Sequence, residues 1–272
     1  MKKETYLPAA AWLGGLGGFA LRRWELTKAN DPQTRLMQMH CATWLLCILV
    51  AGMAVLFLLS CRGMGKKSAE EWFYAPSTGY ILLSVCAGFV LLMAGGIGLW
   101  EQLNLPETDF MARLTAISFM LGGGAVLVFT RKVNRGQWSA NGPVPLMLAC
   151  LAVVLWLICL YQYHARQPEL QLFVWQILSG VFMVLGLYSL VSLAMGKGSA
   201  ARSAVFCLLA MVLIPTALAD MNGSVSVTLV WIFAAVYFTA QSYMLLRGAF
   251  GQPWPERMCL LEEEEDDTDT EE

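Results

Sequence analysis

The chain has 272 residues, of which 57% are hydrophobic and only 14% are charged, whereas an ordinary soluble domain carries about 25% charged residues. A core of this size cannot hide so many apolar side chains from water, so the composition excludes a water-soluble globular protein and indicates a chain that faces lipid. The net charge is −2, and no stripe of basic and aromatic residues argues for nucleic-acid binding.

The first apolar segment, residues 5–21, is short and rich in glycine. We favour a retained membrane helix; the alternatives are a half-buried or re-entrant helix, or a signal peptide cleaved near Ala20. Arg22 and Arg23 follow the segment at once. Positive charge at that point hinders translocation, which argues against cleavage.

Seven further segments have the length of about 20 mostly apolar residues that a helix needs to cross a bilayer. They are residues 42–61, 79–100, 112–130, 144–163, 171–195, 203–221 and 225–246. The sequence therefore predicts an all-α fold, a polytopic transmembrane helix bundle of about eight spans with short loops. Seven spans are the alternative if residues 5–21 do not cross.

The orientation follows from the lysines and arginines of the loops, which are enriched on the cytoplasmic side. With eight spans, 12 of the 18 Lys and Arg lie on the side of both termini and 6 on the other side. This ratio predicts a multi-pass protein of the plasma membrane with both termini in the cytoplasm.

The end of the chain is strongly acidic. Residues 262–272 read EEEEDDTDTEE, whereas residues 1–255 hold 17 Lys and Arg against 10 Asp and Glu. Such a low-complexity acidic stretch predicts disorder. We divide the chain into a transmembrane domain, residues 1–250, and a cytoplasmic acidic tail, residues 251–272. The tail is a candidate contact for a cytoplasmic protein partner, or a solvated segment of little consequence.

Charged residues in a membrane protein are the first candidates for function, and here they lie at the ends of the spans. With eight spans, several of them share the outer side. We predict a solute vestibule there, and its candidate residues are Arg22, Arg23, Glu25, Asp31, Glu101 and Asp220. The alternative interpretation is that these charges are solvated loop ends and helix caps.

Polar residues inside the spans are few. They are Thr115, Ser118, Gln176, Ser179, Gln241 and Ser242. Such groups usually hydrogen-bond to a neighbouring helix. The alternative is that they line a solute pathway.

Glycine and proline mark candidate sites of helix packing or hinge motion. Gly14 and Gly18 form a G-x-x-x-G pair, Gly122, Gly123 and Gly124 are consecutive, and Pro215 lies inside a span. Small residues allow close helix contact, and broken helices of transporters also use glycine.

The sequence gives no sign of catalytic chemistry. It lacks the G-x-S-x-G, H-E-x-x-H and P-loop patterns, its two histidines lie far apart, and its eight cysteines include no C-x-x-C pair. We therefore expect no enzyme activity, no metal site and no cofactor.

Two stretches resemble a family of multi-pass membrane proteins of Gram-positive bacteria to which no activity is assigned. They are residues 14–36, GGLGGFALRRWELTKANDPQTRL, and parts of residues 155–221, including LWLICLYQYHARQPELQLFVWQ and LYSLVSLAMGKGSAARSAVF. The resemblance implies a polytopic membrane protein and carries no functional residue, cofactor or partner.

The leading hypothesis is a small-solute permease, or a membrane subunit of one, in the lipid bilayer. In it Arg22, Arg23 and Asp220 are the gate charges for a polar or anionic solute, and the helices rearrange around residues 122–124 and Pro215. The alternative is a membrane scaffold or sensory protein that does not transport and uses its acidic tail to bind a partner.

Overall fold

The computed structural model describes residues 3–28, 41–65, 67–104, 109–136, 141–165, 173–220 and 224–251. All the regular structure in these ranges is helical. The helices are α1 (Lys3–Lys28), α2 (Cys41–Ser60), α3 (Ala69–Trp72), α4 (Thr78–Leu103), α5 (Phe110–Arg135), α6 (Val144–Ala165), α7 (Val174–Ala194), α8 (Ala200–Leu218) and α9 (Val225–Phe250).

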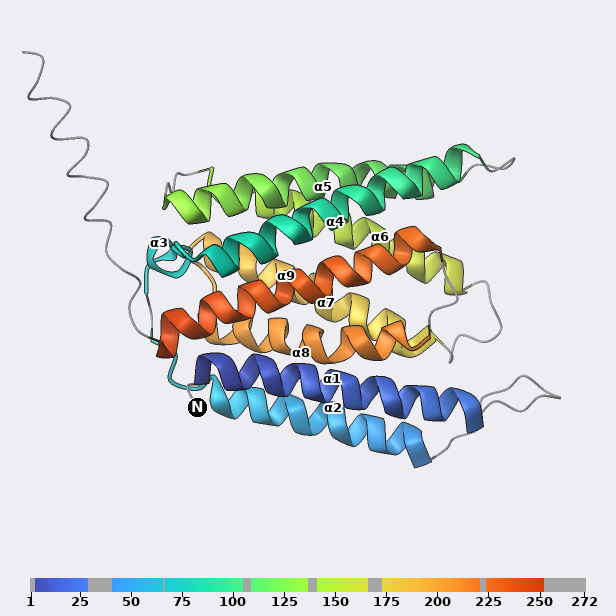
Figure 1. Ribbon diagram of the computed structural model, residues 1–272, viewed down its shortest axis with the longest axis horizontal. Coiled ribbons are helices and arrows are strands. Elements are labelled where there is room, and N and C mark those ends of the chain that lie inside the picture. The colour runs from blue at the N-terminus through green and yellow to red at the C-terminus, as the bar shows by residue number, and fades with distance from the viewer. Residues whose placement is uncertain are drawn as a thin grey trace, which may run out of the picture.

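The eight long helices lie side by side and alternate in direction (Figure 1). In the described part, seven of them, α2 and α4 to α9, are long and apolar enough to cross a membrane. The prediction of a polytopic helical bundle is therefore confirmed, and the protein is an integral membrane protein by the length and composition of its helices.

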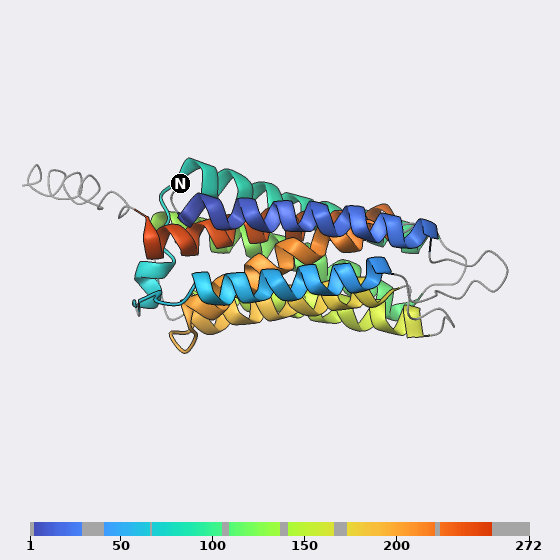
Figure 2. The same cartoon turned by 90° about the horizontal axis from the view of Figure 1, so that it is seen from below.

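Helix contacts arrange the bundle as a ring with a pair of helices beside it. Contacts run from α4 to α5, α6, α7, α8 and α9 in turn and return from α9 to α4, which closes a ring of six helices. Helix α1 packs on α8 and α9, and α2 packs on α1 and α8. Figure 2 shows α1 and α2 together along one flank of the ring.

Burial separates the central helices from the peripheral ones. Nearly all of α8 from Ser203 to Ala217 is buried, whereas only Ala42, Leu46 and Phe57 are buried on α2. Since lipid tails are as apolar as leucine, the exposed leucines of α2 cost nothing in a bilayer. The small and polar residues of α8 are tolerated because neighbouring helices cover them.

Helix α1 extends the predicted segment 5–21 at both ends. Its 26 residues correspond to about 39 Å at 1.5 Å per residue, enough to cross a bilayer core of about 30 Å. It is continuous and shows no reversal of a re-entrant segment. Glycine, tyrosine and tryptophan lower its hydropathy, so it is absent from the seven apolar helices, but it lies along the whole bundle (Figure 1).

The alternation of the eight helices places Lys3 and Gly251 at the same end of the bundle, here called the terminal end (Figure 1). At the other end of the bundle, here called the opposite end, α1, α4 and α8 end at Lys28, Leu103 and Leu218. The predicted acidic tail lies outside the described residues, which end at Gly251.

Several glycines mark close helix contacts. A Cβ atom added at Gly14 would lie 2.8 Å from Cε of Met53 on α2, and one at Gly18 would overlap Thr216 on α8. On α5, a Cβ at Gly123 would lie 2.8 Å from the carbonyl oxygen of Gly88.

The other two glycines of the 122–124 run have more space around them. A Cβ at Gly122 would lie 3.1 Å from that of Ala152, and one at Gly124 would meet nothing within 4 Å. Helix α5 is continuous through all three glycines, and α8 is continuous through the buried Pro215. The described geometry thus supports close packing for Gly18 and Gly123, whereas the neighbour of Gly14 is the flexible end of the Met53 side chain, which can move aside.

Candidate functional site

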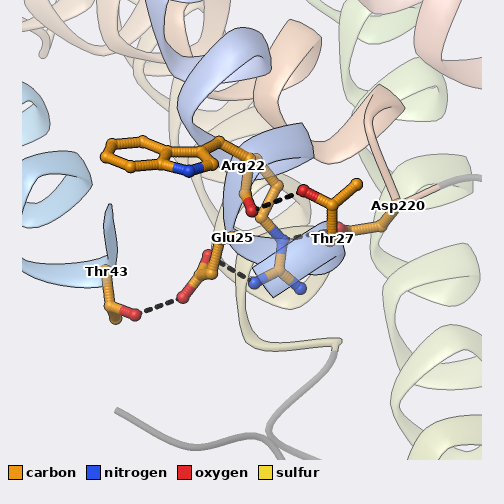
Figure 3. A network of polar contacts seen from close by, with 6 residues as sticks. Arg22, Glu25, Thr27, Thr43 and Asp220 are labelled. Carbon is orange, nitrogen blue, oxygen red and sulfur yellow. Dashed lines mark hydrogen bonds and ion pairs between the residues drawn. The ribbon is translucent and has the colours of Figure 1, made fainter. Parts of the chain in front are cut away.

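Three of the predicted vestibule residues form a buried ion-pair cluster at the opposite end (Figure 3). Arg22 donates through Nη1 to Glu25 Oε2 at 2.7 Å and through Nε to Asp220 Oδ1 at 2.5 Å. Thr43 at the start of α2 donates to Glu25 Oε1. These four residues, here called the Arg22 cluster, connect α1 and α2 to the end of α8.

The Arg22 cluster is almost completely shielded from solvent. The side chains of Arg22, Glu25 and Asp220 are 1%, 3% and 4% exposed. The pKa of Asp220 is raised from its usual 3.8 to about 6: burial is the largest cause and the charge of Glu25 adds to it, while the hydrogen bond and charge of Arg22 act in the opposite direction. One cation thus holds two carboxylates, and the cluster carries a net negative charge when both are ionised.

The other candidate residues are placed differently. Arg23 is exposed, and its guanidinium carbon lies 6.0 Å from the ring centre of Phe19 on the outside of α1. Glu101 lies at the end of α4 and is only partly exposed. Asp31 lies outside the described residues.

A cavity of about 560 Å³ lies inside the six-helix ring at the opposite end. Its wall comes from α4, α5, α6, α7 and α9, from the residues that directly precede α5, α7 and α9, and from Asp220, which follows α8. The lining residues are Gly98, Glu101, Gln102, Asp109, Ala112, Thr115, Ala116, Phe119, Trp156, Cys159, Leu160, Gln162, Tyr163, Phe173, Gln176, Asp220, Ser224, Ser226 and Val227. Asp109 and Tyr163 are exposed, so the cavity reaches the protein surface.

The charge of this wall has one sign. Among the lining residues that the structure describes, Glu101, Asp109 and Asp220 are carboxylates and none is a lysine or arginine. Asp109 also caps α5, because its Oδ1 accepts from the backbone N–H of Met111 at 3.0 Å. Asp220 is shared, since one oxygen binds Arg22 and the residue itself lines the cavity.

Aromatic rings form the inner part of the cavity. The ring centres of Trp156 and Trp231 lie 5.0 Å apart in an edge-to-face arrangement, and Phe119 lies 6.5 Å from Trp156. Trp231 is fully buried, and its Nε1 has no hydrogen-bond partner among the described residues. Phe119 and Trp156, which line the cavity, are here called the aromatic floor, and Trp231 packs against Trp156 without being a lining residue itself.

Buried polar groups continue from the floor toward the terminal end. Gln241 donates to the hydroxyl of Tyr80 at 3.1 Å, between α9 and α4. The Tyr237 hydroxyl and Gln241 Oε1 are buried without a partner in the described part of the chain. In native structures such groups are usually bound to ordered water or a ligand.

The sequence identified Thr115, Gln176 and Gln241 as polar residues of the interior, and the structure places the first two in the cavity wall. It did not identify Tyr80 and Tyr237. A tyrosine inside an apolar segment gives no sequence signal that distinguishes an interior hydroxyl from an interfacial one.

Within the described ranges, no group of three or more His, Cys, Asp and Glu side chains is arranged to hold a metal ion. Comparison of the chain with protein-family models, curated proteins and solved structures finds no match. The family resemblance of residues 14–36 therefore stays a prediction, and the site has to be interpreted from its own geometry.

Proposed function

We propose that the protein is a small-solute permease, or the membrane subunit of one, in which the solute enters the cavity inside the helix ring. The cavity volume of about 560 Å³ carries this proposal, because it falls within the range of about 300–1,000 Å³ that is typical of small-molecule sites. A cavity of this kind, walled by helices that are long enough to cross the membrane, suits entry from one side.

The buried polar groups beyond the aromatic floor support a route through the ring. An unpaired polar group is costly in a membrane interior. Trp231, Tyr237 and Gln241, all on α9, nevertheless each carry a buried polar atom that has no partner among the residues that the structure describes. These groups are stabilised if water or solute reaches them. Their order along α9 leads from the cavity toward the terminal end.

The roles of the gate charges differ from the first hypothesis in this proposal. Asp220 and Glu101 contact the solute, whereas Arg22 supports Asp220 from behind and Arg23 has no part in the site. The aromatic pair Trp156 and Trp231 is the barrier that has to move. We further propose that the terminal end, which carries most of the basic residues, faces the cytoplasm.

Uptake by proteoliposomes tests this function. The purified protein is reconstituted, and uptake of radiolabelled choline, glycine, glucose and acetate is measured against protein-free vesicles. Ala112→Trp fills the cavity from its wall and is expected to abolish uptake of the transported solute. Leu114→Trp is the matched control, because Leu114 lies on the same helix and is 37% exposed on its outer surface.

Uptake that is equal in protein-containing and protein-free vesicles for all four solutes contradicts the permease. The scaffold or sensory protein would then be the better proposal. Uptake that persists in Ala112→Trp would show that a solute crosses by another route and would contradict the role of the cavity.

A further inference from the structure

The charged residues of the cavity wall bear on which solutes can enter, and the inference drawn from them deepens the proposed function on which it rests. Three carboxylates, Glu101, Asp109 and Asp220, come from three different places in the chain and line the same space. Charges that face a cavity with a low-dielectric wall act more strongly than charges in water, and they concentrate ions of the opposite sign. The wall therefore favours a cation and repels an anion.

Asp220 supplies an observation that is independent of this charge count. Its side chain is only 4% exposed, and its Oδ1 accepts from Arg22. Its Oδ2 is buried and has no hydrogen-bond partner in the described part of the chain. A buried carboxylate oxygen without a donor is costly. Asp220 is a lining residue of the cavity, so the partner that we assign to Oδ2 is a donor or cation that enters the cavity beside it.

The aromatic residues of the wall indicate what kind of cation fits. Phe119 and Trp156 lie at the inner end, and Tyr163 and Phe173 contribute to the wall. Aromatic faces attract organic cations through cation–π interactions. A bare metal ion needs several oxygen ligands at about 2–2.6 Å, and the volume of about 560 Å³ is far larger than such a site.

We infer that the cavity binds a small organic cation, an amine or quaternary ammonium compound, with Asp220 as its counter-ion and the aromatic floor around its apolar part. In this arrangement Asp220 shares its two oxygens between Arg22 and the ligand. Arg22 fixes the carboxylate and does not touch the ligand. Glu101 and Asp109 attract the cation to the cavity before it reaches Asp220.

A cysteine already in the wall provides a probe of this charge preference. Cys159 lines the cavity and lies 3.0 Å from the Thr115 hydroxyl. Two thiol reagents of similar size differ in charge: trimethylammonioethyl methanethiosulfonate is a quaternary cation, and sulfonatoethyl methanethiosulfonate is an anion. The rate of each with Cys159 is measured in the full-length protein, and a Cys159→Ala variant gives the background from the other thiols.

We expect the cationic reagent to be favoured over the anionic one by about tenfold or more, relative to the same pair reacting with a free thiol; tenfold corresponds to about 1.4 kcal/mol. Asp220→Asn should remove most of this preference. A ratio equal to that of the free thiol, a preference for the anion, or no reaction with either reagent would overturn the inference. Asp109→Asn, which keeps an N-cap residue, should reduce the ratio even if Asp220→Asn fails to fold.

Ligand binding gives a second test with matched isosteres. Choline, 3,3-dimethylbutanol and 3,3-dimethylbutyrate have nearly the same shape and carry a positive, no and a negative charge. Among the three compounds, only choline is expected to stabilise the purified protein thermally. Asp220→Asn should weaken the affinity for choline roughly 10- to 100-fold, because the substitution removes the ion pair between the carboxylate and the quaternary ammonium group. Equal effects of choline and the alcohol would contradict a counter-ion.

The two proposals fail in different ways. If Cys159 shows the charge preference but no solute is taken up by proteoliposomes, the cation site stands and the permease is wrong. If a neutral or anionic solute is taken up in a manner that Ala112→Trp abolishes, the permease stands and the cation site is wrong.

Discussion

Replacing Arg22 with methionine tests whether the Arg22 cluster is held by charge. The methionine keeps most of the apolar stem and removes the guanidinium, which leaves Glu25 and Asp220 together without their cation. Their side chains are only 3% and 4% exposed, and removing one partner of a buried ion pair typically costs about 3–5 kcal/mol. We expect Arg22→Met to lose stability in this range.

The loss should depend on pH. The Arg22 guanidinium lowers the pKa of Asp220, which is still raised to about 6, mainly by burial, so its removal raises that pKa further. A carboxyl group with a raised pKa in the folded state stabilises the fold when it is protonated, and this contribution is lost as the pH rises through the folded pKa. The variant should therefore be least stable relative to the unmodified protein near pH 8 and recover below pH 6.

Unfolding in detergent micelles, followed by tryptophan fluorescence at several pH values, measures this difference. The triple variant Arg22→Met, Glu25→Gln, Asp220→Asn removes all three charges, and buried ion pairs replaced in this way often cost little. It should be far more stable than Arg22→Met alone. If the triple variant is equally unstable, or if the loss is the same at pH 5 and pH 8, the guanidinium acts through packing and the reasoning is wrong.

Three further predictions follow from the interior, the helix contacts and the topology. Tyr80→Phe leaves the Gln241 amide without its partner and should lower the free energy of unfolding by about 1–3 kcal/mol. The double variant Tyr80→Phe, Gln241→Leu should recover most of this loss, and no recovery would show that the two side chains do not form a pair independent of their surroundings. Gly123→Ala should cost about 1–3 kcal/mol through overpacking, whereas Gly124→Ala, which meets open space, should gain about 0.5–1 kcal/mol from helix propensity; equal effects would contradict the helix contact. A phosphatase or fluorescent-protein fusion after Gly251 should report a cytoplasmic location, and an external signal would reverse the topology.

The number and position of the apolar helices could be predicted from the sequence because lipid imposes a simple requirement on length and composition. The segment 42–61 corresponds to α2, Cys41–Ser60, and 225–246 corresponds to the first part of α9, Val225–Phe250. Helix ends are less predictable. They depend on caps such as Ser224, which accepts from the backbone N–H of Val227, and hydropathy does not detect them.

The cavity could not be predicted from the sequence. Its carboxylates are separated by as many as 119 positions, since Glu101 lies on α4 and Asp220 follows α8. Nothing in the local pattern says that α4 and α9 adjoin in a ring, or that Trp156 on α6 reaches Trp231 on α9. These contacts depend on which helices pack next to one another in space. The hydropathy profile of the sequence would be the same for any such arrangement.

The Arg22 cluster lies between these two cases, because part of it follows from helical spacing. Ala11, Gly15, Gly18, Arg22 and Glu25 are buried on α1 and follow one another at intervals of four and three residues, which places them on one face of the helix. The face of α1 that carries the buried small residues Ala11, Gly15 and Gly18 therefore leads, one turn further, to Arg22 and Glu25. The neighbouring Arg23 falls about 100° around the helix, where it is exposed. The helical position of the two arginines relative to the buried small residues therefore distinguishes the buried Arg22 from the exposed Arg23. The ion-pair partner Asp220 follows another helix, so it could be identified only from the structure.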